Sequence, residues 1–316
     1  MSLKIYFKIY IYTRHIDFVA SRMLILYSDT ISIYRSNNFS GVVFMNSNSF
    51  HDNAANYKLL FDGLREKALS RVFAIEDSDK YEKKIFESAG GATTLSIIRG
   101  KVFEKISICR GEKERDIPKD AEIPDNMKDL KNLPGGKVYM QVFEICSHMM
   151  NPKVPVGTLS LRYRSSSNGR TGGGTDLSPY IPFKEDTELF SGNFKKVCAN
   201  FSKDYDGLRE NLKKTFWLKY RNEPRGGLAG IAFDLPAQEF DFIQTVGNTF
   251  IDTYFSIVEK RKMEPYTEEE RNYLLFRRGR WVEFNLIEDE GFKYGLEIGV
   301  NPEVMILQTL PPSVKF

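Results

Sequence analysis

Histidine and cysteine are scarce in this chain of 316 residues, which contains three of each. The cysteines Cys109, Cys146 and Cys198 are odd in number and never stand in C-x-x-C spacing. This pattern excludes a zinc site built on cysteine pairs and predicts reduced, buried thiols in a non-oxidising compartment. Histidine, the usual proton carrier near neutral pH, is available at only three positions, so few sites could use it.

Long apolar runs and an excess of one charge are also missing. No stretch of about eighteen apolar residues occurs, so we predict no membrane span. The 45 Lys and Arg residues nearly balance the 42 Asp and Glu residues, and the resulting charge of +3 gives no reason to expect nucleic-acid binding. What is present, 41% hydrophobic and 13% aromatic residues, is typical of a globular protein with one large or two small domains.

The first 45 residues differ from the rest. The run L-K-I-Y-F-K-I-Y-I-Y at residues 3–12 is β-prone, aromatic and basic. It fits an added N-terminal strand, and it fits equally an over-extended gene model that properly starts at Met23 or Met45. A mitochondrial presequence would share the basic bias but should be more helical and contain less Tyr and Ile. We therefore predict an extension over residues 1–45 and one main domain over residues 46–316.

Hydrophobic periodicity in the main domain predicts helices interrupted by runs of strands. A stripe at three- and four-residue spacing follows Pro236, and Thr267 with Glu270 forms a capping box for the next helix. Residues 111–136, charged and Pro-rich, are predicted to be a surface loop. Helices are expected at 56–70, 185–200, 203–219, 234–257 and 268–277, and strands within 94–108, 138–146, 158–164 and 281–287. This order indicates an α/β or α+β fold.

The segment N-G-R-T-G-G-G-T-D-L-S-P at residues 168–179 is the strongest candidate for chemistry. Three consecutive glycines leave the backbone without Cβ atoms, so other atoms can approach closely and positive φ is allowed. Asp176 follows at once, and such a backbone can place one carboxylate at the floor of a pocket. The alternative is a flexible surface turn with an ordinary aspartate. The segment is not a nucleotide loop, since it lacks G-x-G-x-x-G spacing and a following Gly-Lys-Ser/Thr.

Four further segments, in this order, share one family pattern. They are R-G-K-V-F-E-K at 99–105, H-M-M-N-P-K-V-P-V-G-T-L-S-L-R at 148–162, R-N-E-P-R-G-G-L-A-G-I-A-F-D at 221–234, and R-R-G-R-W-V-E-F-N at 277–285. Together with G-G-G-T-D-L-S-P, the set resembles oxygen-dependent coproporphyrinogen III oxidase over residues 57–312. The resemblance implies a single domain in which a large, flat antiparallel sheet is covered by helices on both faces.

The resemblance also implies an activity. Members of this family decarboxylate two propionates of coproporphyrinogen III oxidatively to vinyl groups, giving protoporphyrinogen IX in haem biosynthesis. Molecular oxygen is the co-substrate and no organic cofactor is needed. The family further implies a tetrapyrrole substrate, a homodimer and a cytoplasmic location, or a mitochondrial one if residues 1–45 are a targeting segment.

Site residues carry over position by position. Asp176 matches the carboxylate that faces the pyrrole nitrogens, where burial would raise its pKa. Arg162 matches a strand arginine that can grip a propionate, although a structural ion pair is an equal alternative. Thr158 and Ser160 should share its strand face and line one wall. The remaining substrate-binding expectations are Gly173, Gly174, Arg225 and Gly299.

Other charged residues of the motifs are expected to be structural. Asp186 fits the first turn of a helix better than a catalytic role. A solvated basic corner beside Glu283 is expected from Arg277, Arg278 and Arg280.

Departures from the family pattern keep a second hypothesis open. Thr158 stands where the family has histidine, and Ser160 where it has asparagine. The family's Gly-Gly-Arg is Gly299-Val300-Asn301, and Glu290 replaces another arginine. Only His148 remains of a histidine set, so we predict no metal site. A catalytically impaired relative that binds a porphyrinogen, or serves as a dimeric scaffold, would show such changes.

Overall fold

The computed structural model describes residues 22–26, 31–35, 50–117, 130, 136–165, 169–226 and 229–316, which form two units dividing at residue 52. In the shorter unit, β1 (Arg22–Leu26) pairs antiparallel with β2 (Ile31–Arg35). The β-prone run at residues 3–12 lies outside the described residues.

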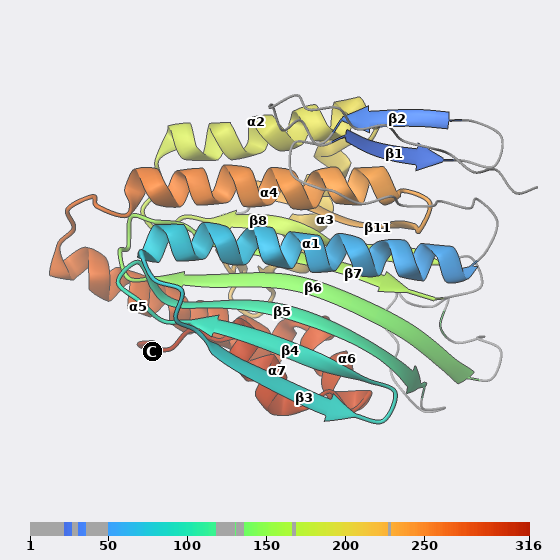
Figure 1. Ribbon diagram of the computed structural model, residues 1–316. Helices are drawn as coiled ribbons and strands as arrows, with labels where there is room; N and C mark the ends of the chain where they lie inside the picture. The colour runs from blue at the N-terminus through green and yellow to red at the C-terminus, as the bar shows by residue number, and fades with distance from the viewer. Residues whose placement is uncertain are drawn as a thin grey trace, which may run out of the picture. The chain divides into compact units, whose positions relative to one another are not determined.

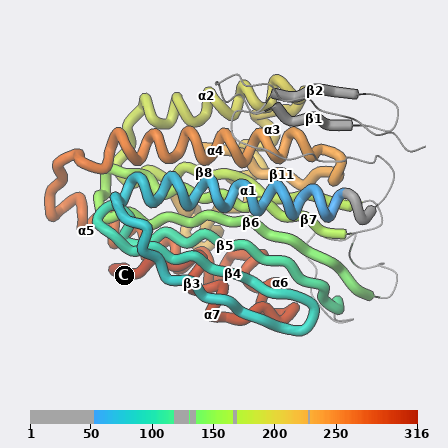
Figure 2. Tube along the Cα trace, in the orientation of Figure 1, coloured from blue at the N-terminus to red at the C-terminus, as the bar shows by residue number. Residues whose placement is uncertain are grey.

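The larger unit, from residue 53 onward, is built around a seven-stranded sheet with the order β11-β8-β7-β6-β5-β4-β3. All six pairings are antiparallel, and β3 to β8 follow one another as a meander that Figure 2 traces along the chain. The strands are β3 (Glu82–Ser88), β4 (Gly91–Ile98), β5 (Phe103–Asp116), β6 (Lys137–Met149), β7 (Val156–Arg164), β8 (Arg170–Ser178) and β11 (Ala229–Pro236). A separate two-stranded ribbon joins β9 (Trp217–Leu218) to β10 (Glu223–Pro224).

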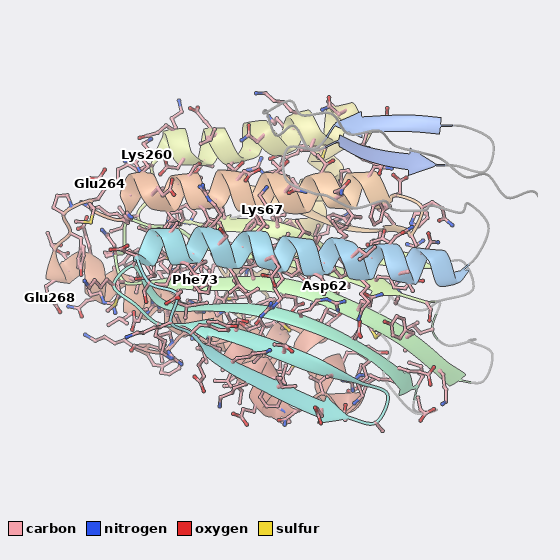
Figure 3. The ribbon with its side chains drawn as sticks, in the orientation of Figure 1. Asp62, Lys67, Phe73, Lys260, Glu264 and Glu268 are labelled. Carbon is pink, nitrogen blue, oxygen red and sulfur yellow. The ribbon has the colours of Figure 1, made fainter. Side chains whose placement is uncertain are left out.

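Three helices cover one face of this sheet: α1 (Phe50–Glu76), α2 (Lys184–Asn200) and α4 (Phe240–Arg261), all on the near side in Figure 1. The expected stripe on α4 is buried and joins the largest hydrophobic cluster, together with Leu159, Leu161 and Tyr163 of β7. Lys67 of α1 donates hydrogen bonds to Asn248 and Asp252 of α4, which lies alongside (Figure 3). The helix α3 (Tyr205–Thr215) packs beside the edge strand β11.

The opposite face is covered by the C-terminal part of the chain. Its elements are α5 (Glu268–Glu283), a π-helical turn labelled η3 (Phe284–Glu288), α6 (Glu290–Glu297) and α7 (Pro302–Thr309). Both hydrogen bonds of the predicted capping box between Thr267 and Glu270 are present. Helices thus lie on both faces of one antiparallel sheet, which confirms the predicted α+β fold class.

One predicted element is wrong, and two others begin later than predicted. Residues 281–287, expected as a strand because polar and apolar residues alternate, continue α5 and then form η3. Trp281 and Phe284, three residues apart, are both buried, so helical spacing decides the conformation. The loop expected from residue 111 begins later, because β5 extends to Asp116. Likewise β11 runs to Pro236, and α4 starts only at Phe240.

Three further sequence expectations concern the thiols, membrane spans and metal sites. Cys109, Cys146 and Cys198 are free and buried, as predicted. Within the described residues, no helix is long and apolar enough to cross a bilayer. The same residues contain no group of three or more His, Cys, Asp or Glu side chains arranged to hold a metal ion.

Candidate active site

Asp176 lies in the interior of the sheet. It stands on β8, opposite Thr158 of β7 on one side and Gly230 of β11 on the other. Its side chain is 1% exposed, so the alternative of a surface turn with an ordinary aspartate is wrong. The side chain points to the face covered by α5 and η3, because the next residue, Leu177, belongs to the core on the opposite face.

The glycines before Asp176 have a structural cause. Gly173 has a φ of +145°, and a Cβ there would lie 1.9 Å from the carbonyl oxygen of Ser160. A Cβ on Gly174 would lie 2.5 Å from the carbonyl oxygen of Ile231. Only glycine therefore lets β8 fit between its two neighbours. Whether these two glycines also contact substrate stays a prediction.

The carboxylate of Asp176 is only partly satisfied. Its Oδ2 accepts hydrogen bonds from Ser178 Oγ at 2.6 Å and from Arg225 Nη2 at 3.1 Å. Its Oδ1 is buried and finds no hydrogen-bond partner among the residues that the structure describes. Burial raises the pKa of this carboxyl from 3.8 to about 6, although Arg225 and Ser178 oppose the shift. A carboxyl of this kind can exchange a proton near neutral pH.

Arg225 is held by aromatic rings as well as by Asp176. Its guanidinium lies 3.7 Å from the ring centre of Phe216 and 3.7 Å from that of Trp281, with Phe284 at 5.3 Å. These contacts fix the plane of the cation and stabilise its charge in a buried position. The Nε atom is buried without a partner within the described part of the chain. Arg225 therefore places a fixed positive charge beside the carboxylate of Asp176.

Arg162 faces the same side as Asp176. The register pairs Thr158 with Asp176, Ser160 with Gly174 and Arg162 with Gly172, so the three β7 residues share one strand face, as predicted. That this face lines a substrate site stays a prediction. Arg162 donates from Nε and Nη2 to Glu144 Oε1 of β6, at 3.2 Å and 2.8 Å. Of the two alternatives for this arginine, the structure therefore contains the ion pair.

A second acid, the half-buried Asp289, lies near Arg162. Burial raises the pKa of Asp289, while the positive charge of Arg162 opposes that shift. Asp289 is the N-cap of α6 and accepts a hydrogen bond from Asn285 Nδ2 at 3.0 Å. The guanidinium of Arg162 is thus paired with the carboxylate of Glu144 and is close enough to Asp289 to affect its pKa.

Gly299 occupies the end of α6. Its φ of +77° and the hydrogen bond from Val300 N to Gly295 O are those of a glycine that terminates a helix. The residue is exposed, and no atom lies within 4 Å of the position its Cβ would take. Asn301 caps α7 through Glu303 N. Helix termination explains Gly299, and its contact with substrate stays a prediction.

Comparison with known proteins decides the family. The model of the coproporphyrinogen III oxidase family matches residues 56–316. This chain belongs to that family. It is 36% identical over 235 residues to the oxygen-dependent coproporphyrinogen-III oxidase of Rickettsia bellii strain RML369-C, covering 72% of this chain and 81% of the relative. The enzyme of the same name from Rickettsia rickettsii strain Sheila Smith is 37% identical over 237 residues, covering 72% and 82%.

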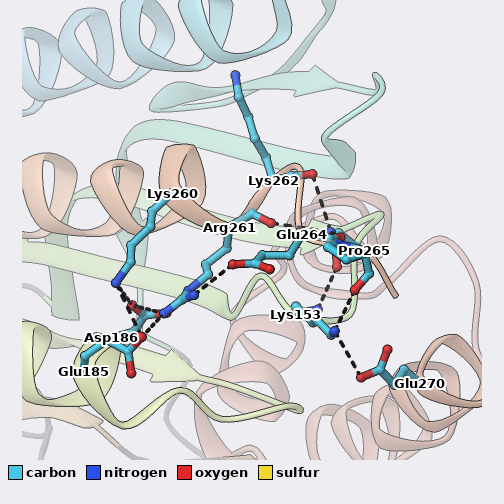
Figure 4. A network of polar contacts seen from close by, with 10 residues as sticks. Lys153, Glu185, Asp186, Lys260, Arg261, Lys262, Glu264, Pro265 and Glu270 are labelled. Atoms are coloured by element: carbon cyan, nitrogen blue, oxygen red, sulfur yellow. Dashed lines mark hydrogen bonds and ion pairs between the residues drawn. The ribbon is translucent and has the colours of Figure 1, made fainter. Parts of the chain in front are cut away.

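Other family motif residues have structural roles here. Asp186 is in the first turn of α2, as predicted, and pairs with Arg261 Nε of α4 at 2.7 Å (Figure 4). The prediction of a solvated arginine corner is wrong for Arg278, which is fully buried and donates to Glu104 and to the carbonyl of Met149. Its neighbours are half-buried, and Arg280 pairs with both Glu223 and Glu283.

His148 is buried against the C-terminal end of α7. Its Nε2 lies 2.9 Å from the carbonyl oxygen of Thr309, and its ring packs edge-on against Trp281. Burial holds the pKa of this imidazole well below its usual value, so it is neutral at physiological pH. The one histidine retained from the family's set therefore holds α7 and Trp281 in place.

Two features of the site were not predicted from the sequence. Glu144 lies on a predicted strand, but no motif singles it out. Phe216, Trp281 and Phe284 meet around Arg225 although they come from α3's end, α5 and η3. No local pattern indicates this convergence, which depends on the tertiary fold.

Proposed function

We propose that this chain is an oxygen-dependent oxidase that converts coproporphyrinogen III to protoporphyrinogen IX. Each of two propionate groups would lose carbon dioxide and two hydrogens to become a vinyl group. One molecule of oxygen per propionate would accept both electrons and both protons and leave as hydrogen peroxide. The names of the family and of the relatives support this reaction, and the site supplies the acid–base group that it needs.

The observation that carries the proposal is Asp176. Its carboxyl is buried, its pKa is raised to about 6, and Oδ1 has no partner in the described part of the chain. At neutral pH such a group is ionised, and the adjacent Arg225 stabilises the charged form of the carboxylate. The carboxylate can then accept a proton from a pyrrole N–H. The electron-rich pyrrole can then react with oxygen directly, so we propose no cofactor.

The strand face beside Asp176 carries few side chains, which suits a flat macrocycle. Gly174 shares this face and is half-buried, so a ring could approach the sheet there, whereas Asp234 and Arg164 lie against Gly172. Arg162 stands opposite Gly172. Gly172 is four residues before Asp176 on β8, so Arg162 lies about 13 Å from Asp176 along the strand direction. Pyrrole nitrogens lie at the centre of the substrate and carboxylates at its edge. Asp176 would face the centre, while Arg162 would lie near the edge.

The test is an oxidase assay. Coproporphyrinogen III prepared without oxygen is mixed with the purified chain in air, and protoporphyrin is detected by fluorescence after oxidation. We expect turnover above the uncatalysed background, and its loss in Asp176→Asn. Asp252→Asn, a matched change on the exposed surface of α4, should keep full activity.

The substitution of histidine by Thr158 favours a second candidate, a binding relative without activity. Tight tetrapyrrole binding without turnover would support that candidate and contradict the oxidase. Neither binding nor turnover would leave only a scaffold role. We further propose that the chain is a cytoplasmic homodimer, and sedimentation should then give twice the mass of the chain.

A further inference from the structure

Glu144 already forms an ion pair with Arg162, the arginine that a substrate carboxylate would bind. Its Oε1 accepts three hydrogen bonds, from Ser160 Oγ at 2.8 Å and from Nε and Nη2 of Arg162 at 3.2 Å and 2.8 Å. All three residues lie on the same face of adjacent strands, since Glu144 of β6 stands directly opposite Ser160 of β7. The contact is therefore built into the sheet and does not depend on a mobile loop.

The Nε–Nη2 edge of a guanidinium is one of the two edges to which a carboxylate can bind in bidentate fashion. Glu144 takes up that edge of Arg162 and offsets its charge, and the half-buried carboxyl of Asp289 also lies near the guanidinium, because both groups lie within 4 Å of the position that a Cβ on Gly291 would take. The side chain of Arg162 is nevertheless 36% exposed, more than the 19% of Glu144. An incoming group can reach the arginine, but it meets a cation that is already neutralised.

We infer that Glu144 is a specificity-determining residue, which competes with a substrate carboxylate for Arg162. This inference rests on the proposed function and deepens it. A tetrapyrrole that presents a carboxylate at this position must displace Glu144, whereas one that presents an uncharged or merely hydrogen-bonding group there loses nothing. The site therefore discriminates among tetrapyrroles by the number and position of their carboxylates, and favours fewer charges at the edge beside Arg162.

Ser160 strengthens this competition. Its hydroxyl donates to the same oxygen of Glu144 that the arginine binds, so the carboxylate is fixed by two neighbouring positions of one strand. A fixed carboxylate is a stronger competitor than a freely rotating one, because less conformational entropy is lost in keeping it in place. Displacement must break both contacts at once.

Binding measurements with the stable oxidised porphyrins test the inference without turnover. Coproporphyrin III has four carboxylates and mesoporphyrin IX has two, and binding of each can be followed by fluorescence titration. We expect Glu144→Gln to bind coproporphyrin III roughly tenfold more tightly than the unmodified chain, a change within the range of one hydrogen bond to a charged group. Mesoporphyrin IX should bind both proteins with the same affinity.

The control is Glu112→Gln. Glu112 also pairs with an arginine from a sheet strand, but its other partner is Lys58 of α1, so it lies on the opposite face. The substitution removes the same charge and should leave both affinities unchanged. Glu144→Ala provides a second variant, and adding Arg162→Met to Glu144→Gln should abolish the gain.

Four results separate the outcomes. Tighter binding of coproporphyrin III alone, lost with Arg162→Met, supports the inference. Equal affinity of the unmodified chain and both Glu144 variants overturns it and leaves the proposed function intact. An equal gain in Glu112→Gln would assign the effect to overall charge and would also overturn it. If neither porphyrin binds to any of the proteins, the proposed function fails, and the inference fails with it.

Discussion

Two Asp–Arg pairs in the described part of the molecule have both side chains almost fully buried, yet they differ in chemistry. Asp186 and Arg261 are both 4% exposed, and Asp176 and Arg225 are 1% and 3% exposed. In the first pair Arg261 also binds Glu185 and Glu264, and Asp186 also binds Lys260 (Figure 4). The hydrogen bonds that Arg261 donates to Asp186, Glu185 and Glu264 raise its pKa.

The pair at Asp176 is incompletely satisfied by comparison. One carboxylate oxygen and the Nε of Arg225 find no partner among the described residues, and aromatic rings rather than acids surround the cation. Fully paired buried charges add rigidity and have no reason to exchange protons. A carboxyl with a free oxygen and a raised pKa remains available for a substrate proton. The comparison therefore separates a structural ion pair from a candidate catalytic one.

The largest effect should come from removing the charge at Asp176. Asp176→Asn keeps the shape but cannot accept a proton, so we expect turnover of coproporphyrinogen III to fall by roughly 10²–10⁴-fold. Turnover is measured by the fluorescence assay at saturating oxygen. Activity of the variant within a few-fold of the unmodified chain would remove Asp176 from the mechanism.

Breaking the other pair should reduce stability instead. Arg261→Met leaves Asp186 buried without its main partner, and we expect a loss of about 3–5 kcal/mol in the free energy of unfolding. Urea denaturation followed by circular dichroism measures this. The folded fraction should retain activity per molecule, and a selective loss of turnover in folded protein would show that the two pairs are not distinct.

The activity should depend on pH through Asp176. Since the carboxyl must be ionised to act as a base, and its pKa is about 6, kcat/KM should fall below pH 6 and reach a plateau above it. A profile that stays flat down to pH 5 would contradict this assignment.

The same pKa has a consequence for stability. The folded chain holds the Asp176 proton more tightly than the unfolded chain, whose pKa is near 3.8. The stability gained from that proton is fully present below pH 3.8 and is lost as the pH rises through about 6. In Asp176→Asn, this contribution should disappear from the pH dependence of unfolding, as urea denaturation of both proteins across this range would measure.

Removing the cation beside Asp176 should move the profile. Arg225 lowers the pKa of Asp176 against the effect of burial, so Arg225→Met should raise this pKa further. The rising limb of kcat/KM then shifts to higher pH. Arg221→Met, which breaks an exposed pair with Glu283, serves as the control and should leave the limb unchanged.

The smallest effect concerns the positions where this chain departs from its family. Thr158 stands directly opposite Asp176, so Thr158→His with Ser160→Asn would bring an ionisable group to the carboxylate that we propose as the base. We expect turnover to rise several-fold with little change in the melting temperature. An unchanged rate would mean that the missing histidine does not limit this site.

Much of the fold could be predicted, because the spacing of hydrophobic residues indicates which face of a helix or strand is buried. The α4 stripe, the capping box at Thr267 and the strands at 138–146 and 158–164 follow from local patterns that the tertiary structure keeps. The strand containing Asp176 could not be recognised in this way, because three glycines have no side chains to alternate. Residues 281–287 alternate yet are helical, since Trp281 and Phe284 must both reach the sheet face.

The site was predictable only in part. Motifs pointed to Asp176, Arg162 and Arg225, but their partners depend on strand register. Glu144 meets Arg162 because β6 pairs with β7 in one particular alignment, which no local pattern encodes. The raised pKa of Asp176 was predicted from the resemblance, but not that α5 and η3 bury that face.

The most direct test of the account follows the protonation of Asp176 itself. Infrared difference spectra of the unmodified chain and Asp176→Asn, recorded between pH 4 and pH 8, isolate the carbonyl stretch of this one carboxyl. The account predicts a protonated-carboxyl band that disappears with a midpoint near 6 and is absent from the variant. A carboxylate that is already ionised at pH 4 would contradict the claim that this buried, half-satisfied acid is the proton acceptor.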